Sequence, residues 1–309
     1  MKVNLLSGYL KQVYGHKIYK ISLNGGMSCP NRDGKLGTGG CIFCSAGGSG
    51  DFAPSPLMSV TNQIEEGKKQ IENKYKGSGY IAYFQAYSNT YGDMDYLRKI
   101  FTEAISHPQV EILSIATRPD CIDRERAMLI GELNKIKPVW VELGLQTSNE
   151  KSAKYIKRGY DNSVFEDAVE MLAKQNVECI VHMIIGLPCE TREDMINTVK
   201  YINGFNIKGI KFQLLHVLKG TSLAEIYNRE KFHIYSLEEY TDILLELIEY
   251  LREDIVIHRM TGDGPKKLLI EPLWTGNKRM VLNSINREFS RRNIIQGSKW
   301  ANVHKQQCF

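Results

Sequence analysis

Three cysteines in one early loop are the feature that most constrains this chain. Cys41 and Cys44 are separated by two residues, and Cys29 lies twelve positions before Cys41 across a glycine-rich stretch. Structural zinc sites and ordinary electron-transfer clusters use four protein ligands, whereas a catalytic site keeps one position open. Three thiolates therefore predict a [4Fe–4S] cluster with one iron left without a protein ligand. The alternative is a zinc loop whose fourth ligand lies elsewhere in the chain.

Cysteine usage and hydropathy indicate where such a chain works. The 309 residues are 42% hydrophobic and contain seven cysteines, an odd number of which three are clustered. This pattern argues against a secreted disulfide framework. The N-terminus has no apolar signal region, and no apolar stretch approaches transmembrane length. We expect a protein of the reducing cytoplasm with no membrane partner.

Apolar, β-branched runs alternate with segments of helical spacing along most of the chain. We predict strands at residues 18–23, 80–85, 111–117, 139–146, 178–185 and 210–217. Helical spacing predicts helices at residues 59–75, 94–106, 123–136, 162–175, 192–204 and 236–252. This alternation is typical of an α/β fold with a parallel sheet, in which ligands collect beyond the carboxyl ends of the strands. Six units are too few for an eight-fold barrel, so we predict an open, partial (β/α)6 barrel over residues 1–254 and a C-terminal extension over residues 255–309.

Two local sequences suggest a family. Residues 28–34 read Ser-Cys-Pro-Asn-Arg-Asp-Gly, and residues 84–91 read Phe-Gln-Ala-Tyr-Ser-Asn-Thr-Tyr. With the cysteine spacing, they resemble the radical S-adenosylmethionine (SAM) superfamily, in particular its YhcC/YtqA-type subgroup, which is related to Elp3-like enzymes. The resemblance implies a partial barrel in which three cysteines hold three irons and SAM chelates the fourth. Electron transfer would then cleave SAM to a 5′-deoxyadenosyl radical that abstracts hydrogen from the substrate.

The resemblance also implies which strand ends hold SAM. Many family members carry a Gly-Gly-Glu motif after the second strand, where this chain offers Gln85, Ser88 and Asn89 to the SAM amino group. Glu142 and Gln146 share one face of the fourth predicted strand, because strand side chains alternate, and are expected near the SAM ribose and the cluster. A polar turn and a buried structural ion pair at Glu142 are the alternatives.

Two later segments complete the SAM site that the resemblance implies. Arg158 is expected to bind the SAM carboxylate through its fork of donors. Gly186 and Pro188 shape a tight turn whose backbone is expected to lie against the adenine. A surface arginine in a basic loop is the alternative for Arg158.

Other polar residues near strand ends are candidates for substrate binding. Arg118 and Asp120 either pair with each other or line the mouth of the pocket. His182 is either a hydrogen-bonded core histidine or a base, and Gln213 extends from the sixth predicted strand. Gln213 and His216 fall on opposite faces of a regular strand, so both line the pocket only if a bulge intervenes.

Charge is distributed unevenly and suggests a polyanionic partner. Residues 1–50 carry six lysines and arginines against one acid, and residues 259–309 carry ten against three. Basic ends therefore flank an acidic middle, a pattern found in nucleic-acid-binding chains as well as on ordinary solvated surfaces. The C-terminal candidates for RNA contact are Arg287, Arg291 and Arg292, whose helical spacing also suits a plain solvated helix.

These features support a ranked set of functions. The resemblance implies an enzyme acting on the anticodon arm of tRNA. It would convert 5-carboxymethylaminomethyl(-2-thio)uridine to 5-aminomethyl(-2-thio)uridine at the wobble position, with an electron donor such as flavodoxin or ferredoxin. The alternatives are a radical SAM enzyme acting on a small metabolite or protein, and a non-catalytic Fe–S scaffold in an RNA-modifying complex. Polar strand ends favour an enzyme, since a scaffold needs no SAM pocket.

Overall fold

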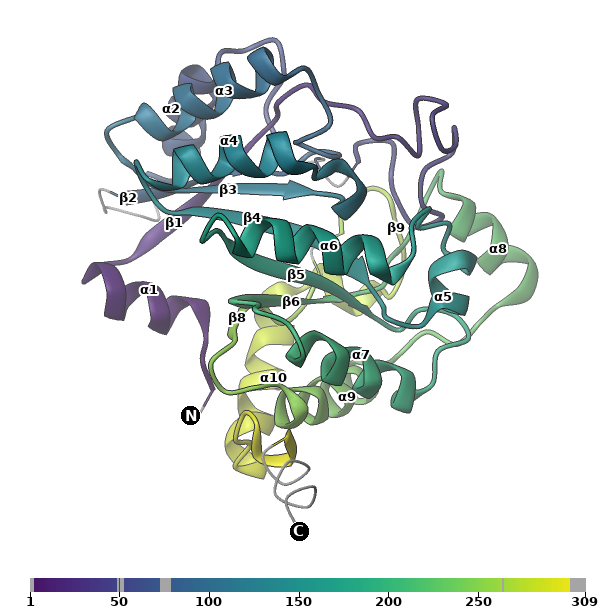
Figure 1. Ribbon diagram of the computed structural model, residues 1–309. Helices are drawn as coiled ribbons and strands as arrows, with labels where there is room; N and C mark the ends of the chain where they lie inside the picture. Colours follow the sequence, from purple (N-terminus) through teal and green to yellow (C-terminus); the bar gives the residue numbers. More distant parts are fainter. Residues whose placement is uncertain (1–2, 49, 51–52, 73–78, 263, 301–309) are drawn as a thin grey trace.

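A curled sheet of seven parallel strands forms the centre of the molecule (Figure 1). The computed structural model describes residues 3–48, 50, 53–72, 79–262 and 264–300. In spatial order the strands are β1 (Ile18–Leu23), β2 (Gly79–Phe84), β3 (Val110–Thr117), β4 (Val139–Gln146), β5 (Glu178–Ile185), β6 (Gly209–Leu214) and β8 (Val256–Arg259). The predicted α/β class and partial barrel are confirmed, with a seventh strand beyond the six predicted.

Crossover helices pack on the outer face of this sheet (Figure 1). Six of them occupy the predicted segments: α2 (Val60–Ile71), α3 (Met94–Ser106), α4 (Arg124–Asn134), α6 (Asn162–Ala173), α7 (Arg192–Asn203) and α9 (Leu237–Tyr250). Local sequence sets their starts, as at α7, where Thr191 and Asp194 form a capping box. The last three residues of the predicted helix 59–75 lie outside the described residues. No helix in the described part of the chain is long and apolar enough to cross a membrane.

Several elements were not predicted. The described residues also form α1 (Leu6–Tyr14), α5 (Glu150–Tyr155), α8 (Ser222–Glu230), α10 (Lys278–Arg292), the 3-10 turns η1 (Pro119–Cys121) and η2 (Leu273–Gly276), and a small antiparallel pair, β7 (Val217–Leu218) with β9 (Leu269–Glu271). The strand predicted at 210–217 is present but shorter, because β6 ends at Leu214 and the chain turns before β7. Periodicity alone does not separate a turn from a strand within an apolar run. The segment after residue 254 begins with β8, which pairs with β6, so the sheet continues past the predicted boundary.

The inner face of the sheet changes from apolar to polar along the strands. Near the amino ends it is apolar, and α1 covers it with Leu10, which packs in a buried cluster with Ile18, Ile81, Ile112, Trp140 and Ile180. Two residues further along, the inward side chains are polar and include Lys20, Glu142, His182 and Lys211. Every second side chain of a strand points to the same face of the sheet. The inward face is therefore filled by apolar side chains at the amino ends of the strands and lined by polar ones, around a cavity, toward their carboxyl ends.

Candidate active site

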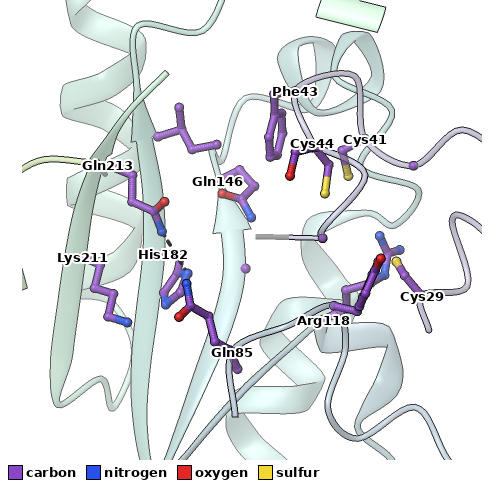
Figure 2. A pocket seen from close by; sticks show the side chains of 18 of the residues that line it. Cys29, Cys41, Phe43, Cys44, Gln85, Arg118, Gln146, His182, Lys211 and Gln213 are labelled. Atoms are coloured by element: carbon purple, nitrogen blue, oxygen red, sulfur yellow. Dashed lines mark hydrogen bonds between the residues drawn. The ribbon is translucent and has the colours of Figure 1, made fainter. Parts of the chain in front are cut away.

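The cavity opens at the carboxyl ends of the strands, as expected for a parallel sheet. Its wall includes the cysteine loop, the ends of β2 to β6 and the segment after β8. Figure 2 shows the three cysteines and Phe43 on one side, with His182, Lys211 and Gln213 on the other. Strand ends and an early loop distant in sequence therefore meet around one space.

Backbone contacts shape the cysteine loop. The amide of Arg32 donates to the carbonyl of Cys29 at 2.8 Å, and the amide of Cys44 donates to that of Cys41 at 3.0 Å. The Arg32 guanidinium donates to the carbonyl oxygens of Cys44 and Ser45 at 3.0 and 2.6 Å. A side chain at Gly40, where φ is +74°, would meet Arg32 Nε at 2.9 Å, so this position requires glycine.

Asn31 attaches the loop to the segment between β4 and α6. Its Nδ2 donates to the carbonyls of Lys157 at 2.7 Å and Arg158 at 3.3 Å, and lies 3.5 Å from the Sγ of Cys41. Asn31 is 6% exposed. The amide thus holds the loop in place and directs N–H groups toward a thiol of the predicted cluster.

The three thiols are expected to lose their protons only when a positive charge lies beside them. None of the three forms a disulfide, and all three line the cavity. Burial, followed by the neighbouring Cys44, raises the pKa of the Cys41 thiol to about 11. Iron would supply the compensating positive charge and hold the thiols deprotonated. The described residues contain no group of three or more His, Cys, Asp or Glu side chains already placed to bind a single metal ion.

Glu142 lies at the bottom of the cavity, where its carboxylate is fully engaged. Oε1 accepts from Lys20 Nζ at 2.9 Å and Ser114 Oγ at 2.7 Å. Oε2 accepts from His182 Nε2 at 2.7 Å and from Lys211 Nζ. Burial opposes ionisation of Glu142, but the two lysines hold its pKa well below the usual range. The buried ion pair named as the alternative is therefore present, and it limits contact between this carboxylate and a ribose.

His182 belongs to the same network and lines the cavity. Gln213 Nε2 lies 3.0 Å from His182 Nδ1, so the ring accepts from Gln213 and donates from Nε2 to Glu142. Burial, followed by the charge of Lys211, lowers the pKa of His182 to about 4. The ring is thus neutral at pH 7 and held in one tautomer.

Arg158 lines the cavity, but its side chain is engaged within the protein. It is 1% exposed, and its five donors already have acceptors on the protein. Nε donates to the carbonyl of Tyr160, Nη1 to those of Leu145 and Thr147, and Nη2 to Asn162 Oδ1 and Glu150 Oε2. These contacts give no support to the predicted contact with the SAM carboxylate, because the guanidinium organises the turn after β4.

Arg118 and Asp120 form a two-point ion pair. Arg118 Nε and Nη2 donate to the two carboxylate oxygens at 2.8 and 2.7 Å. The guanidinium also lies 4.9 Å from the centre of the Tyr160 ring and lines the cavity, whereas Asp120 does not. The pair fixes Arg118 beside the cysteines, so both sequence alternatives hold in part.

Of the other residues predicted to contact SAM near the cysteines, some line the cavity and one connects the strands behind it. Gln85, Ser88 and Gln146 line the cavity, as does His216 after the end of β6. Asn89 does not, because its Nδ2 donates to the carbonyls of Phe84 and Ala116 and joins the ends of β2 and β3.

The turn after β5 lies behind the cavity wall. Gly186 and Pro188 are not among the lining residues. A side chain at Gly186, where φ is +90°, would meet the Tyr235 ring at 3.1 Å. The predicted contact with an adenine is therefore not supported, since Tyr235 packs against this turn.

The predicted RNA-binding arginines lie on α10 and are paired. Arg291 and Arg292 both donate to Glu288, and Arg292 also pairs with Asp242 of α9. Arg287 Nε lies 4.0 Å from Glu288, and its side chain is 75% exposed. None of the three lines the cavity. Any contact that these arginines make with RNA would therefore lie outside the cavity.

Sequence reasoning missed the lysines at the bottom of the cavity. Lys20 and Lys211 were assigned to strands but not examined for function. Lys20 lies on the inward face of β1, two positions before Ser22. Lys211 lies on the inward face of β6, two positions before Gln213. A charged residue on an inward position of a predicted strand was the available signal.

Comparison with known proteins agrees with this arrangement. The chain matches the Radical SAM superfamily over residues 34–202 and the Radical SAM C-terminal domain over residues 207–291. YtqA of Bacillus subtilis (strain 168) is 40% identical over 296 residues, which cover 96% of this chain and 92% of that protein. YhcC of Escherichia coli (strain K12) is 32% identical over 297 residues, with coverage of 96% and 94%. The structure of Methanocaldococcus infernus Elp3 lacking residues 1–46 matches with a TM-score of 0.68 and 15% identity, over 90% of this chain and 64% of that one, and so has the same fold.

The donor set also fits the group that this family uses. Three thiols from one loop line the cavity, and an amide donor lies beside one of them. This arrangement agrees with the prediction that the three cysteines hold the cluster, and the family match spans more than half of the sequence. The chain belongs to the radical SAM superfamily, whose enzymes use a [4Fe–4S] cluster and S-adenosylmethionine.

Proposed function

We propose that this radical SAM enzyme modifies tRNA. The reaction is conversion of 5-carboxymethylaminomethyl(-2-thio)uridine to 5-aminomethyl(-2-thio)uridine at the wobble position. The observation that carries the proposal is one cavity that joins the three cysteines to a deep, polar and cationic wall. Such a cavity suits a polar side chain inserted beside the cofactor.

Relatives support tRNA as the substrate class. A protein of Methanocaldococcus jannaschii named tRNA uridine(34) acetyltransferase is 25% identical over 53% of this chain and 30% of its own length. Bases in RNA loops can be unstacked and turned into a protein pocket. We infer that the anticodon arm presents its wobble base to the cavity in this way.

Each part of the chain has a role in the proposed reaction. When bound, the cluster and SAM supply a radical able to break an unactivated C–H bond, as cofactors carry such chemistry in general. Cys29, Cys41 and Cys44 hold the cluster, and Asn31 fixes their loop. Gln85, Ser88 and Gln146 line the space for SAM. The reducing cytoplasm, with a donor such as flavodoxin or ferredoxin, is the proposed setting.

A direct assay tests the proposal. Anaerobically reconstituted protein is reduced and incubated with SAM and tRNA bearing carboxymethylaminomethyluridine. We expect aminomethyluridine and 5′-deoxyadenosine by mass spectrometry, and neither product from a Cys41→Ala variant. If the tRNA neither binds nor changes while SAM is cleaved, the tRNA function is wrong.

A small metabolite or a protein remains the second candidate substrate. It is favoured by the pairing of Arg291 and Arg292 with acidic side chains, which reduces the charge that α10 offers to RNA. Cleavage of SAM without any change in tRNA would bring this candidate forward. Absence of SAM cleavage under the same conditions would instead favour the non-catalytic scaffold.

A further inference from the structure

The deepest part of the cavity is a network that neither the cluster nor the known cofactor chemistry requires. We call Lys20, Tyr83, Glu142, His182 and Lys211 the floor cluster; each comes from a different strand, β1, β2, β4, β5 and β6. Four of them, all except Lys20, line the cavity directly. The apolar layer covered by α1 lies below them, so the floor cluster has solvent or ligand on one side only.

Positive charge is in excess within the floor cluster. Two ammonium groups, Lys20 and Lys211, contact the single carboxylate of Glu142. The Lys20 and Lys211 side chains are 23% and 4% exposed, and that of Glu142 is fully buried. His182 adds no charge at neutral pH, since burial and then Lys211 lower its pKa to about 4. One buried carboxylate is therefore shared by two lysines, of which Lys211 is buried and Lys20 is partly exposed.

Neighbouring groups offset this excess only in part. The ammonium groups of Lys20 and Lys211 lie 4.2 and 4.5 Å from the centre of the Tyr83 ring, whose π face attracts cations weakly. Burial lowers the pKa of Lys211 well below its usual value; Glu142 opposes that shift, whereas the positive charges of Lys20 and Arg259 add to it. Burying an incompletely balanced charge is costly. An anion at this place would remove the imbalance.

We propose that the floor cluster is a carboxylate-binding subsite for the substrate, with Lys211 as its cationic contact. Gln213 adjoins it, because one of its amide N–H groups is used on His182 and the other is available to a ligand within the described structure. This inference rests on the proposed function, in which the reacting side chain ends in a carboxylate. Glu142 and His182 act as positioning residues that hold Lys211 and Gln213.

Two carboxylates enter such an enzyme, and the geometry favours that of the substrate. The SAM carboxylate is expected at the cluster, on the side of the cavity formed by Cys29, Cys41 and Cys44. Figure 2 shows Lys211, His182 and Gln213 on the opposite side. The product of the proposed reaction keeps the amine but has lost the carboxymethyl group, so an excess of positive charge would favour the substrate over the product.

Binding of two matched RNAs tests the subsite. Anticodon stem-loops carry either carboxymethylaminomethyluridine or methylaminomethyluridine, which lacks the carboxylate, and affinities are measured with the reconstituted holoenzyme. A charge-assisted contact predicts that wild type prefers the carboxylated RNA by about 10-fold or more. Lys211→Met should reduce this preference to less than about threefold. Lys208→Met removes a lysine just before β6, outside the cavity lining, and should leave the preference unchanged.

The outcomes separate this inference from the proposed function. If wild type converts the carboxylated RNA and Lys211→Met keeps the full preference, the subsite is wrong and the function stands. If Lys211→Met weakens SAM binding and keeps the RNA preference, the contact belongs to the SAM carboxylate and the subsite is again wrong. If wild type neither prefers nor converts the carboxylated RNA, both are wrong. Lys211→Gln, which retains a neutral donor, is measured in parallel, and the brown absorbance of the cluster reports folding of each variant.

Discussion

At the residue scale, single polar side chains connect distant segments to the cluster loop. Asn31 is the clearest case, because one amide joins the loop to the backbone at Lys157 and Arg158 and reaches toward Cys41. Outer hydrogen bonds of this kind orient ligands and tune metal sites. In the proposed site the cysteines supply the iron ligands, and Asn31 contacts one of them, Cys41.

We predict that Asn31→Ala weakens retention of the cluster. Loss of a buried donor with two carbonyl partners should cost about 1–3 kcal/mol and loosen the loop around Cys41. Release of iron to a chelator under anaerobic conditions, followed by absorbance, should be several-fold faster than in wild type. Asn134→Ala is the control, since Asn134 also makes two hydrogen bonds. They join the carbonyl of Asn176 and the amide of Val139, at the start of β4 and away from the cysteine loop. Equal release rates in both variants would show that Asn31 does not hold the loop.

Glu190 provides a pH-dependent prediction at the same scale. Burial raises the pKa of its carboxyl to about 7, although Thr147 donates a hydrogen bond to it. The folded state therefore favours the protonated form, and the stability present below about pH 4.5 is lost as pH rises toward 7. The loss amounts to at most about 3 kcal/mol.

We expect Glu190→Gln to remove this dependence. The variant should exceed wild type in free energy of unfolding at pH 8 and match it near pH 5, as measured by urea denaturation without oxygen. Glu193→Gln, an exposed charge-matched change on α7, is the control. A constant difference between Glu190→Gln and wild type across this pH range would contradict the shift.

At the element scale, α1 closes the amino end of the curled sheet. Leu10 is 4% exposed and packs into the apolar layer below the floor cluster, whereas Val13 on the same helix is 55% exposed. This layer shields the buried charges from solvent on that side. The helix therefore supports the polar cavity without contributing a residue to it.

We predict that Leu10→Ala destabilises the protein, because Leu10 packs against the amino end of the sheet. Deleting a buried leucine side chain should lower the free energy of unfolding by about 2–5 kcal/mol. Val13→Ala should change it by less than about 0.5 kcal/mol, as is usual on a surface. Urea denaturation of the two variants makes the comparison, and similar losses would show that α1 is not packed as described.

At the scale of the whole molecule, the arginines of α10 combine two roles. Arg292 connects α10 to Asp242 of α9 and so contributes to packing between helices. The side chains of Arg287 and Arg291 pair with Glu288 of the same helix but are 75% and 65% exposed, so a polyanion can reach them. The three arginines, grouped together by sequence, are therefore divided by the tertiary structure.

We predict that Arg287→Ala with Arg291→Ala weakens tRNA binding across sequences. The slope of log affinity against log salt concentration should become shallower by the amount expected for about one or two phosphate contacts. The reason is that two charges that release counterions on binding are removed. Arg292→Ala should instead reduce stability slightly, as exposed ion pairs contribute about 0–1 kcal/mol. Filter binding at several salt concentrations gives the slopes. An unchanged affinity in the double variant would remove α10 from the RNA-binding surface.

The sequence by itself determined the chemistry and the architecture in outline. Cys29, Cys41 and Cys44 are close in the chain, so their spacing alone predicted the cluster. Strand and helix signals are local too, and they placed six strands and six helices within a few residues. The errors, such as the extra residues after Leu214, arose where a turn interrupts an apolar run and no local signal marks it.

Only the tertiary structure decided which polar groups meet. Lys20 and Glu142 are 122 positions apart, and Lys211 is a further 69 from Glu142, yet all three share one hydrogen-bonded network. Alternation along a strand tells which side chains point inward, but the curl of the sheet and its register decide which of them touch across the cavity. The turn after β4 brought the backbone carbonyls of Leu145, Thr147 and Tyr160 to Arg158 and so gave it a structural role. Local pattern thus predicts the face on which a residue lies, and only the closure of the sheet selects its partners.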